Sequence, residues 1–202
     1  MRTHLGTSRL AGLLDEPAAG DPAPSGEDVA QRLGQWLGAF DAVGLRTALR
    51  AIGAPADAGR CRAAPADLQE LERDLRQLRE VVARSTGTQD DAPLDRRRHM
   101  ELQRSMESRI EALRVRVRQA LAKASPRLAQ LAALDAAMEQ AFGAREQKLL
   151  ATLPALSERR LAAPGSGPED RHRQVLMAEL ELRLAPVTGL IEALRNEIGP
   201  HA

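Results

Sequence analysis

The segment LQELERDLRQLREVV (residues 68–82) carries Leu or Val at positions 68, 71, 75, 78 and 82. Steps of three and four residues place these side chains in one stripe, which predicts a helix packed lengthwise against another helix. Two later segments repeat the spacing. Their apolar residues are Met106, Ile110, Leu113, Val117, Ala120 and Ala124 in one, and Met177, Leu180, Leu184, Val187, Ile191, Leu194 and Ile198 in the other. No segment alternates apolar and polar residues as a strand does, so the predicted fold is all-α.

The composition indicates a thin molecule. Hydrophobic residues make up 43% and charged residues 28% of the chain, a mixture typical of a folded protein and not of a wholly disordered one. Aromatic residues make up only 1%. A round core is usually filled with aromatic side chains, whereas a helix seam needs only Leu, Ala, Met and Val. We therefore expect an elongated antiparallel helical bundle or coiled-coil hairpin.

Segments rich in Pro and Gly divide the chain. Residues 1–24 predict a flexible N-terminal segment, and residues 25–53 a small N-terminal helical pair that is kinked where Gly38 and Gly44 weaken it. Residues 65–198 predict the elongated bundle, which forms one domain with the helical pair.

Within the bundle, helices are expected at about 65–84, at 95–124 as the longest, and again after Ser125, which precedes Pro126 as a helix cap. Pro154 predicts a kink before a short helix that ends near residue 162. A last helix is expected at 170–198, bent or split by Pro186 together with Gly189. Whether this last helix folds onto the bundle stays open.

Charges beside the stripes indicate which helices pair. The first helix carries acids beside its stripe (Asp67, Glu72 and Asp74), and the second carries bases (Arg109, Arg114, Arg116 and Lys123). Opposite flanking charges select partners in coiled coils. We expect these two helices to lie antiparallel across the loop at 85–93.

Metal and catalytic sites are poorly supported. The four histidines (His4, His99, His172 and His201) are scattered without ligand spacing, and His99 and His172 lie among arginines, so both are predicted to be surface residues. The glycines of Gly165-Ser166-Gly167 lack the Lys and the preceding strand of a phosphate loop, which indicates a linker. We expect no enzyme activity, no cofactor and no small-molecule substrate.

Asp135 is the one acid in an otherwise apolar stripe, between Leu131 and Met138. One interpretation is a general base or a docking point. The other is an ion pair with an arginine of a neighbouring helix that fixes the register, or exposure at a helix edge. We favour the second, because no other catalytic group lies nearby in the sequence.

Residues 96–123 form a basic helix with nine cations and three anions, although the net charge of the chain is only +1. Such a helix can follow a phosphate backbone, which makes a nucleic-acid-binding regulator the alternative function. No aromatic residues interleave with these cations to stack on bases, and several of the arginines flank the stripe, where acidic helices would cover them.

Two further features bear on location and partners. The lone Cys61 fits a reducing compartment, and no apolar run is long enough for a signal peptide or a membrane span, so we expect a cytoplasmic protein without membrane insertion. Trp36, Leu37 and Phe40 are the candidate partner-binding patch, since aromatic residues dominate interface energetics. Aromatic residues at such positions are more often simply the core of a helical hairpin.

Three blocks carry a family resemblance: EDVAQRLGQWLGAFDAVGLRTAL (27–49), RRRHMELQRSMESRIEALRVRVRQALAKASPRLAQLAALDAAMEQAFGAREQKLLATLPALSERR (96–160) and MAELELRLAPVTGLIEALRNE (177–197). Their order and spacing resemble a proteobacterial domain-of-unknown-function family, number thirty-three forty-eight in that series. The chain departs from that pattern after residue 160, where Pro164 to Pro168 interrupt what similar proteins continue as helix.

The resemblance implies no catalytic residues, because the family has no assigned activity. It does imply a gene neighbourhood with a large membrane protein similar to the MotA/TolQ/ExbB proton-channel group and with an OmpA-like peptidoglycan-binding protein. The expected function is therefore a non-enzymatic helical adaptor or scaffold, as a cytoplasmic accessory of an envelope-spanning, ion-driven complex. Its partner would be another protein or a second copy of the chain, bound through exposed helix faces.

Overall fold

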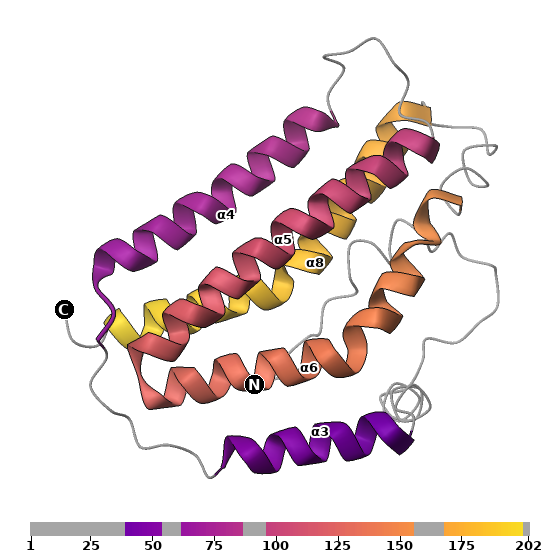
Figure 1. The fold of residues 1–202 in the computed structure, drawn as a ribbon. Helices are drawn as coiled ribbons and strands as arrows, with labels where there is room; N and C mark the ends of the chain where they lie inside the picture. The colour runs from indigo at the N-terminus through magenta and orange to yellow at the C-terminus, as the bar shows by residue number, and fades with distance from the viewer. Residues whose placement is uncertain (1–38, 54–61, 87–95, 156–167, 200–202) are drawn as a thin grey trace, which may run out of the picture.

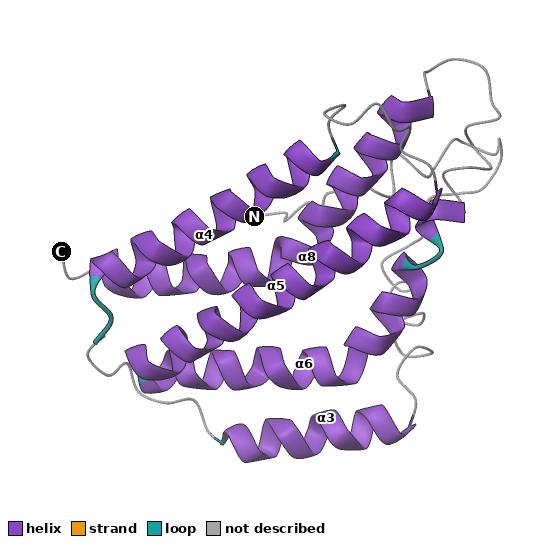
Figure 2. Ribbon diagram, turned by 45° about the horizontal axis from the view of Figure 1, so that its top comes forward, coloured by secondary structure: helices purple, strands orange, loops and turns teal. Residues whose placement is uncertain are grey.

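The computed structural model describes residues 39–53, 62–86, 96–155 and 168–199, and these residues confirm the all-α prediction (Figures 1 and 2). The helices that can be traced in full within these ranges are α3 (Ala39–Ile52), α4 (Pro65–Ser85), α5 (Arg96–Ala124), α6 (Pro126–Leu150) and α8 (Pro168–Ile198). Within these ranges no residue lies in a strand.

The core lies where α4, α5 and α8 pack against one another, side by side in both ribbon views (Figures 1 and 2). The predicted stripes supply it. The buried members are Leu71, Leu75, Leu78 and Val82 of α4, Met106, Ile110, Leu113, Val117 and Ala124 of α5, and Leu180, Leu184, Val187, Ile191 and Leu194 of α8. Leu68, Ala120, Met177 and Ile198 are partly buried against the same cluster. The last helix therefore does fold onto the bundle.

Helix α4 runs antiparallel to α5, as the flanking charges predicted, and Arg116 of α5 pairs with Asp74 of α4 at 2.7 Å. The bundle is not wholly antiparallel, however. Gln103 contacts Glu179 and Ser125 contacts Glu197, so α5 and α8 run in the same direction. The reason is geometric: of three helices that all touch one another, at least two must point the same way.

The α5–α6 connection follows the predicted capping chemistry. The Ser125 hydroxyl accepts a hydrogen bond of 3.2 Å from the Leu128 backbone N–H, and Pro126 occupies the first helical turn of α6. The chain thus reverses within one residue. Helix α6 diverges from α5, bends partway along its length, and has α3 along its first half (Figure 1). The Gln130 side chain donates to the Ile52 backbone oxygen at 3.1 Å, which joins the start of α6 to the end of α3.

The last helix was predicted to be bent or split by Pro186 with Gly189, and of these the split is wrong, because α8 is continuous over 31 residues. It is therefore longer than α5, at 29 residues, which had been expected to be the longest. Proline leaves only the carbonyl four residues earlier without a donor, and that residue, Leu182, lies on the exposed side of α8 where water can bond instead.

Helix α3 is the described part of the predicted N-terminal helical pair, and Gly44 does not interrupt it. The first half of the pair and the N-terminal segment 1–24 lie outside the described residues. Near Pro154 the chain forms a helical turn at 153–155, and the remainder of the predicted short helix lies outside the described residues. No helix in the described part of the chain has the length and apolar character needed to cross a membrane.

Candidate functional site

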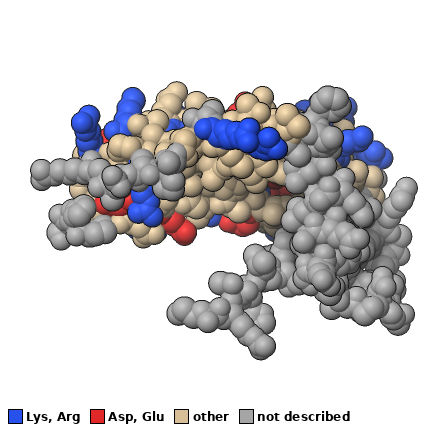
Figure 3. Space-filling view, turned by 90° about the horizontal axis from the view of Figure 1, so that it is seen from below, with Lys and Arg blue, Asp and Glu red and all other residues tan. Residues whose placement is uncertain are grey.

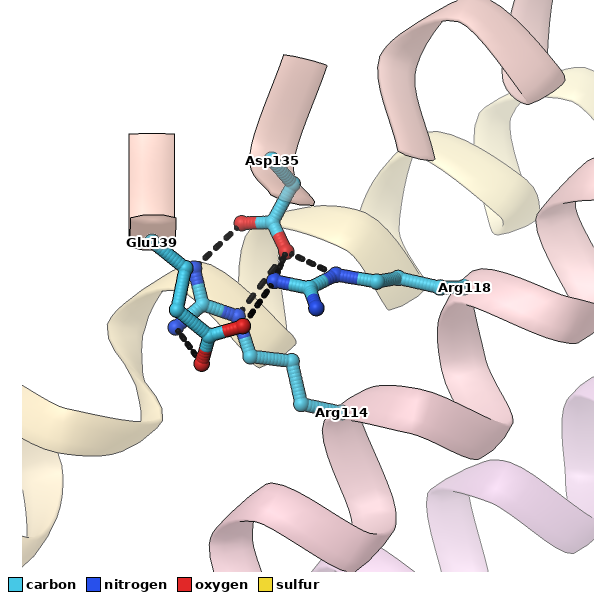
Figure 4. A network of polar contacts seen from close by, with 4 residues as sticks. All are labelled: Arg114, Arg118, Asp135 and Glu139. Carbon is cyan, nitrogen blue, oxygen red and sulfur yellow. Dashed lines mark hydrogen bonds and ion pairs between the residues drawn. The ribbon is translucent and has the colours of Figure 1, made fainter. Parts of the chain in front are cut away.

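Four charged side chains meet between α5 and α6, and Figure 4 shows them converging from the two helices. Arg114 donates from Nε to Oδ2 of Asp135 at 2.8 Å and from Nη2 to Oδ1 at 2.6 Å. Its Nη1 donates to Oε1 of Glu139 at 3.0 Å. Arg118 donates from Nε to Oδ2 of Asp135 at 2.6 Å, and its Nη2 lies 2.7 Å from Oε2 of Glu139.

The spacing of these residues explains why they meet. Arg114 and Arg118 are one turn apart on α5, and Asp135 and Glu139 are one turn apart on α6. Because the helices run antiparallel, the two arginines face the two carboxylates. The side chains of Asp135 and Arg114 are only 11% and 13% exposed, so this charge network is largely shielded from water. The sequence singled out Asp135, and the structure places it against arginines of the neighbouring helix.

The network shifts two pKa values. Burial acts to raise the pKa of Asp135, but the hydrogen bonds and positive charges of Arg114 and Arg118 outweigh it, and the pKa lies below its usual value. Burial likewise acts to lower the pKa of Arg114. The hydrogen bond and charge of Asp135, with the charge of Glu139, outweigh that effect and raise the pKa. Both groups are therefore held in their charged forms, and Asp135 is poorly suited to act as a general base near neutral pH.

Next to the network is a notch with a volume of about 380 Å³, bounded by α5, α6 and Arg183 of α8. Its lining includes the carboxylates of Glu107, Glu111 and Glu146. Its two guanidinium groups already have partners, since Arg114 bonds Asp135 and Arg183 bonds Glu179. The described lining offers no hydroxyl, thiol or imidazole, so it presents charge and no nucleophile.

A second group of polar side chains, which sequence reasoning missed, lies in the core between α5 and α8. We call His99, Gln103, His172 and Glu179 the buried polar cluster. His99 and Glu179 are fully buried, and His172 is 3% exposed. The prediction that both histidines are surface residues is therefore wrong: neighbouring arginines in the sequence said nothing about the helix face on which each histidine lies.

Within the cluster the contacts are specific. The Nδ1 atoms of His99 and His172 lie 3.4 Å apart, and Nε2 of His99 lies 3.7 Å from Oε2 of Glu179. Gln103 donates from Nε2 to the same Oε2 at 2.8 Å and to the Leu150 backbone oxygen at 3.0 Å. Arg183 donates to the other oxygen of Glu179 at 2.8 Å. The sequence did hold a signal: positions 99, 103 and 106 continue the α5 stripe backward in steps of four and three.

Metal binding finds no support in this arrangement. Among the described residues, no three His, Cys, Asp or Glu side chains are grouped so that they could hold a metal ion. The Glu179 carboxylate is already bonded by Gln103 and Arg183.

The predicted partner-binding patch is only partly described. Trp36 and Leu37 lie outside the described residues, and Phe40 lies in the first turn of α3 with its side chain outside them. Beyond this patch, α3 exposes Val43 to 65% and Leu49 to 47%. Figure 3 shows the side of the molecule on which α3 lies, where a broad region is neither acidic nor basic and few basic side chains cross it.

The basic helix of the alternative function corresponds to α5. At least three of its nine cations are committed to acids of neighbouring helices: Arg114 and Arg118 pair with Asp135, and Arg116 pairs with Asp74. Arg97 pairs with Glu101 within α5 itself.

A family model described as "Protein of unknown function (DUF3348)" matches residues 1–163. The match covers α3 to α6 and ends before α8, so the block at 177–197, which also resembled the family, lies beyond it. Comparison with curated proteins and with solved structures found no match. Because the matched residues make up most of the chain, this protein belongs to the DUF3348 family of proteins of unknown function.

Proposed function

We propose that the protein is a non-enzymatic helical adaptor or scaffold that binds another protein through an exposed helix face. The observation that carries the proposal is the exposure of Val43 and Leu49 on α3. The half-buried side chains of this helix, Leu45, Ala48 and Ile52, account for its packing on α6. A helix that is apolar beyond its packed face is typical of one covered by a second neighbour.

The predicted patch supports the same region. Trp36, Leu37 and Phe40 lead directly into the first turn of α3, so the aromatic residues and the exposed apolar residues belong to one continuous stretch of sequence. A short helix of this kind is marginal in isolation and gains stability by packing. A partner helix laid along α3 would bury its exposed apolar side chains.

The family resemblance suggests which partner to test first. Proteins of this kind are expected beside a MotA/TolQ/ExbB-like membrane protein, so the proposed role is a cytoplasmic accessory of an envelope-spanning, ion-driven complex. A pull-down from native cells, identified by mass spectrometry, tests this with the unaltered protein and with a variant carrying Val43→Ala and Leu49→Ala. Both changes remove apolar surface without lowering helix propensity.

We expect a subunit of that complex to be captured by the unaltered protein and lost from the double variant. The matched control is Thr47→Ala, an exposed change on the same helix that leaves the apolar side chains in place. Equal capture by all three proteins would contradict binding through α3. Capture of no membrane-complex subunit by any of them would contradict the proposed partner.

The nucleic-acid alternative is less well supported, because partners on α4 and α6 already occupy Arg114, Arg116 and Arg118. Phosphate contacts would have to displace these acids. A filter-binding assay separates the two functions: retention of DNA or RNA that falls steeply with salt would favour the regulator, and its absence the adaptor.

A further inference from the structure

We propose that the buried polar cluster (His99, Gln103, His172 and Glu179) restricts α5 and α8 of one chain to a single parallel alignment. It thereby excludes alignments in which α8 is shifted along α5. The inference concerns the isolated protein and does not depend on the proposed adaptor function.

The rest of the interface between α5 and α8 does not fix their alignment. Along α5 and α8 the other core positions are filled by Leu, Ile, Val, Met and Ala. Aliphatic layers of this kind are nearly interchangeable, so a shift by one heptad would bury similar apolar area. The buried polar cluster is the layer in which the partners are not interchangeable.

The hydrogen bonds of this layer show why it favours one alignment of α5 and α8 over others. Both donors of the Gln103 amide are used, one by Glu179 and one by the Leu150 carbonyl, so the end of α6 is tied into the same alignment. Glu179 receives Arg183 on its remaining oxygen. A buried carboxylate with these partners is tolerated, whereas one without them is strongly disfavoured.

A shift of α8 by seven residues in either direction would remove the hydrogen bond between Gln103 and Glu179. Gln103 now faces Glu179. One shift would bring Pro186 to that place, a residue with no N–H and no polar side chain. The opposite shift would bring Glu179 to Ile110, where the carboxylate would be buried against an aliphatic side chain. Single buried polar residues fix register and oligomeric state in coiled coils by the same penalty.

Ion pairs at the surface do not provide the same selection. The pairs Arg79–Glu181 and Glu72–Arg195 join α4 to α8, but their side chains are between 27% and 54% exposed to water. Exposed pairs contribute little to stability and are screened by salt. The alignment of α8 therefore rests on the core layer.

The test uses cysteine cross-linking across α4 and α8. In a chain with Cys61→Ser, the substitutions Arg79→Cys and Glu181→Cys place thiols where side chains now lie within 2.8 Å of each other. A second chain carries Arg79→Cys with Thr188→Cys, seven residues further along α8, and reports the shifted alignment. Both chains are unfolded, refolded and oxidised. With the cluster intact, mass spectrometry should find the disulfide in the first chain and almost none in the second.

An apolar variant then removes the discrimination: His99→Leu, Gln103→Leu, His172→Leu, Glu179→Leu and Arg183→Met. We expect the disulfide between positions 79 and 188 to rise about tenfold or more, the effect of losing one buried polar mismatch penalty. The matched control is Leu113→Met with Leu184→Met, which changes buried residues of the same helices but keeps them apolar and of similar volume. Its cross-links should match those of the parent.

Two results would overturn the proposal: a disulfide between positions 79 and 188 in the parent, or an apolar variant that is folded and still forms only the disulfide between positions 79 and 181. If the five-fold variant fails to fold, the pair variant Gln103→Leu with Glu179→Leu decides, because it removes the two side chains whose contact fixes the alignment. It should give more of the disulfide between positions 79 and 188 than the control. The same pattern in the pair variant and the control would equally reject the proposal.

Discussion

Arg114 of α5 donates two parallel hydrogen bonds to Asp135 of α6, from Nε to Oδ2 at 2.8 Å and from Nη2 to Oδ1 at 2.6 Å. A planar guanidinium matches a carboxylate in this way only when both are held at one distance and angle. The contact lies within the α5–α6 interface, ten residues before the end of α5 and nine residues after the start of α6. It therefore fixes how far and at which register the two helices meet.

Removing the Asp135 side chain should be costly. Asp135→Ala leaves Arg114 and Arg118 largely buried with only Glu139 as a shared partner. Breaking one partner of a buried ion pair typically lowers the free energy of unfolding by about 3 kcal/mol or more. Urea unfolding followed by circular dichroism measures the change. The control is Gln140→Ala, an exposed change on the same helix that should stay within about 0.5 kcal/mol. Similar losses for both variants would contradict a structural role for the network.

Low pH should lower the free energy of unfolding through protonation of Asp135. The folded-state pKa of Asp135 is lowered, so its contribution is fully present above the unfolded value of about 3.9 and is lost as pH falls through the folded pKa. Urea unfolding repeated from pH 6 downward should show this loss below about pH 4. Asp135→Asn has no charge to lose, so its stability should fall less over the same interval. A parallel fall in both proteins would show that other carboxylates carry the acid sensitivity.

Much of the bundle was predictable because its signals are local. The stripes at three- and four-residue spacing fixed which faces of α4, α5 and α8 are buried, and Ser125 with Pro126 marked the α5–α6 reversal. The charges beside the stripes predicted that α4 and α5 are antiparallel neighbours. Such features depend on residues a few positions apart, or on one pair of adjacent helices.

The errors arose where distant elements decide the outcome. His99 was assigned to the surface because Arg96, Arg97 and Arg98 precede it, yet it faces α8, and its burial depends on His172 and Glu179. The parallel pairing of α5 with α8 depends on packing among three helices, and the sequence of one helix does not reveal the direction of the others. The buried residues of helix α6 are Leu128, Ala132, Ala137 and Leu150, which are too few and too widely spaced to form a stripe, so its pattern gave little information on its neighbours.

The packing of α8 can be tested with two leucines on the same helix. Leu184 is fully buried and Leu182 is 36% exposed. Leu184→Ala should lower the free energy of unfolding by about 3 kcal/mol, from lost apolar burial and the cavity left behind. Leu182→Ala should cost less than about 1 kcal/mol. Chemical denaturation of the two variants side by side gives the comparison. Equal costs would mean that α8 does not pack on the bundle with the face described.

A substitution at Gly189 should stabilise helix α8. This glycine lies inside a continuous helix, is exposed, and has no heavy atom within 4 Å of the place where a Cβ would be added. Gly189→Ala should therefore raise the free energy of unfolding by about 0.5–1 kcal/mol, because alanine loses less backbone entropy in a helix. The contrasting change is Gly53→Ala at the end of α3, where φ is +81° and a Cβ is strained although the surroundings are open. That variant should lose helical signal or stability. Thermal unfolding of both variants measures the two changes. A lower stability of Gly189→Ala would mean that α8 is broken near Pro186, which is the split that the sequence predicted.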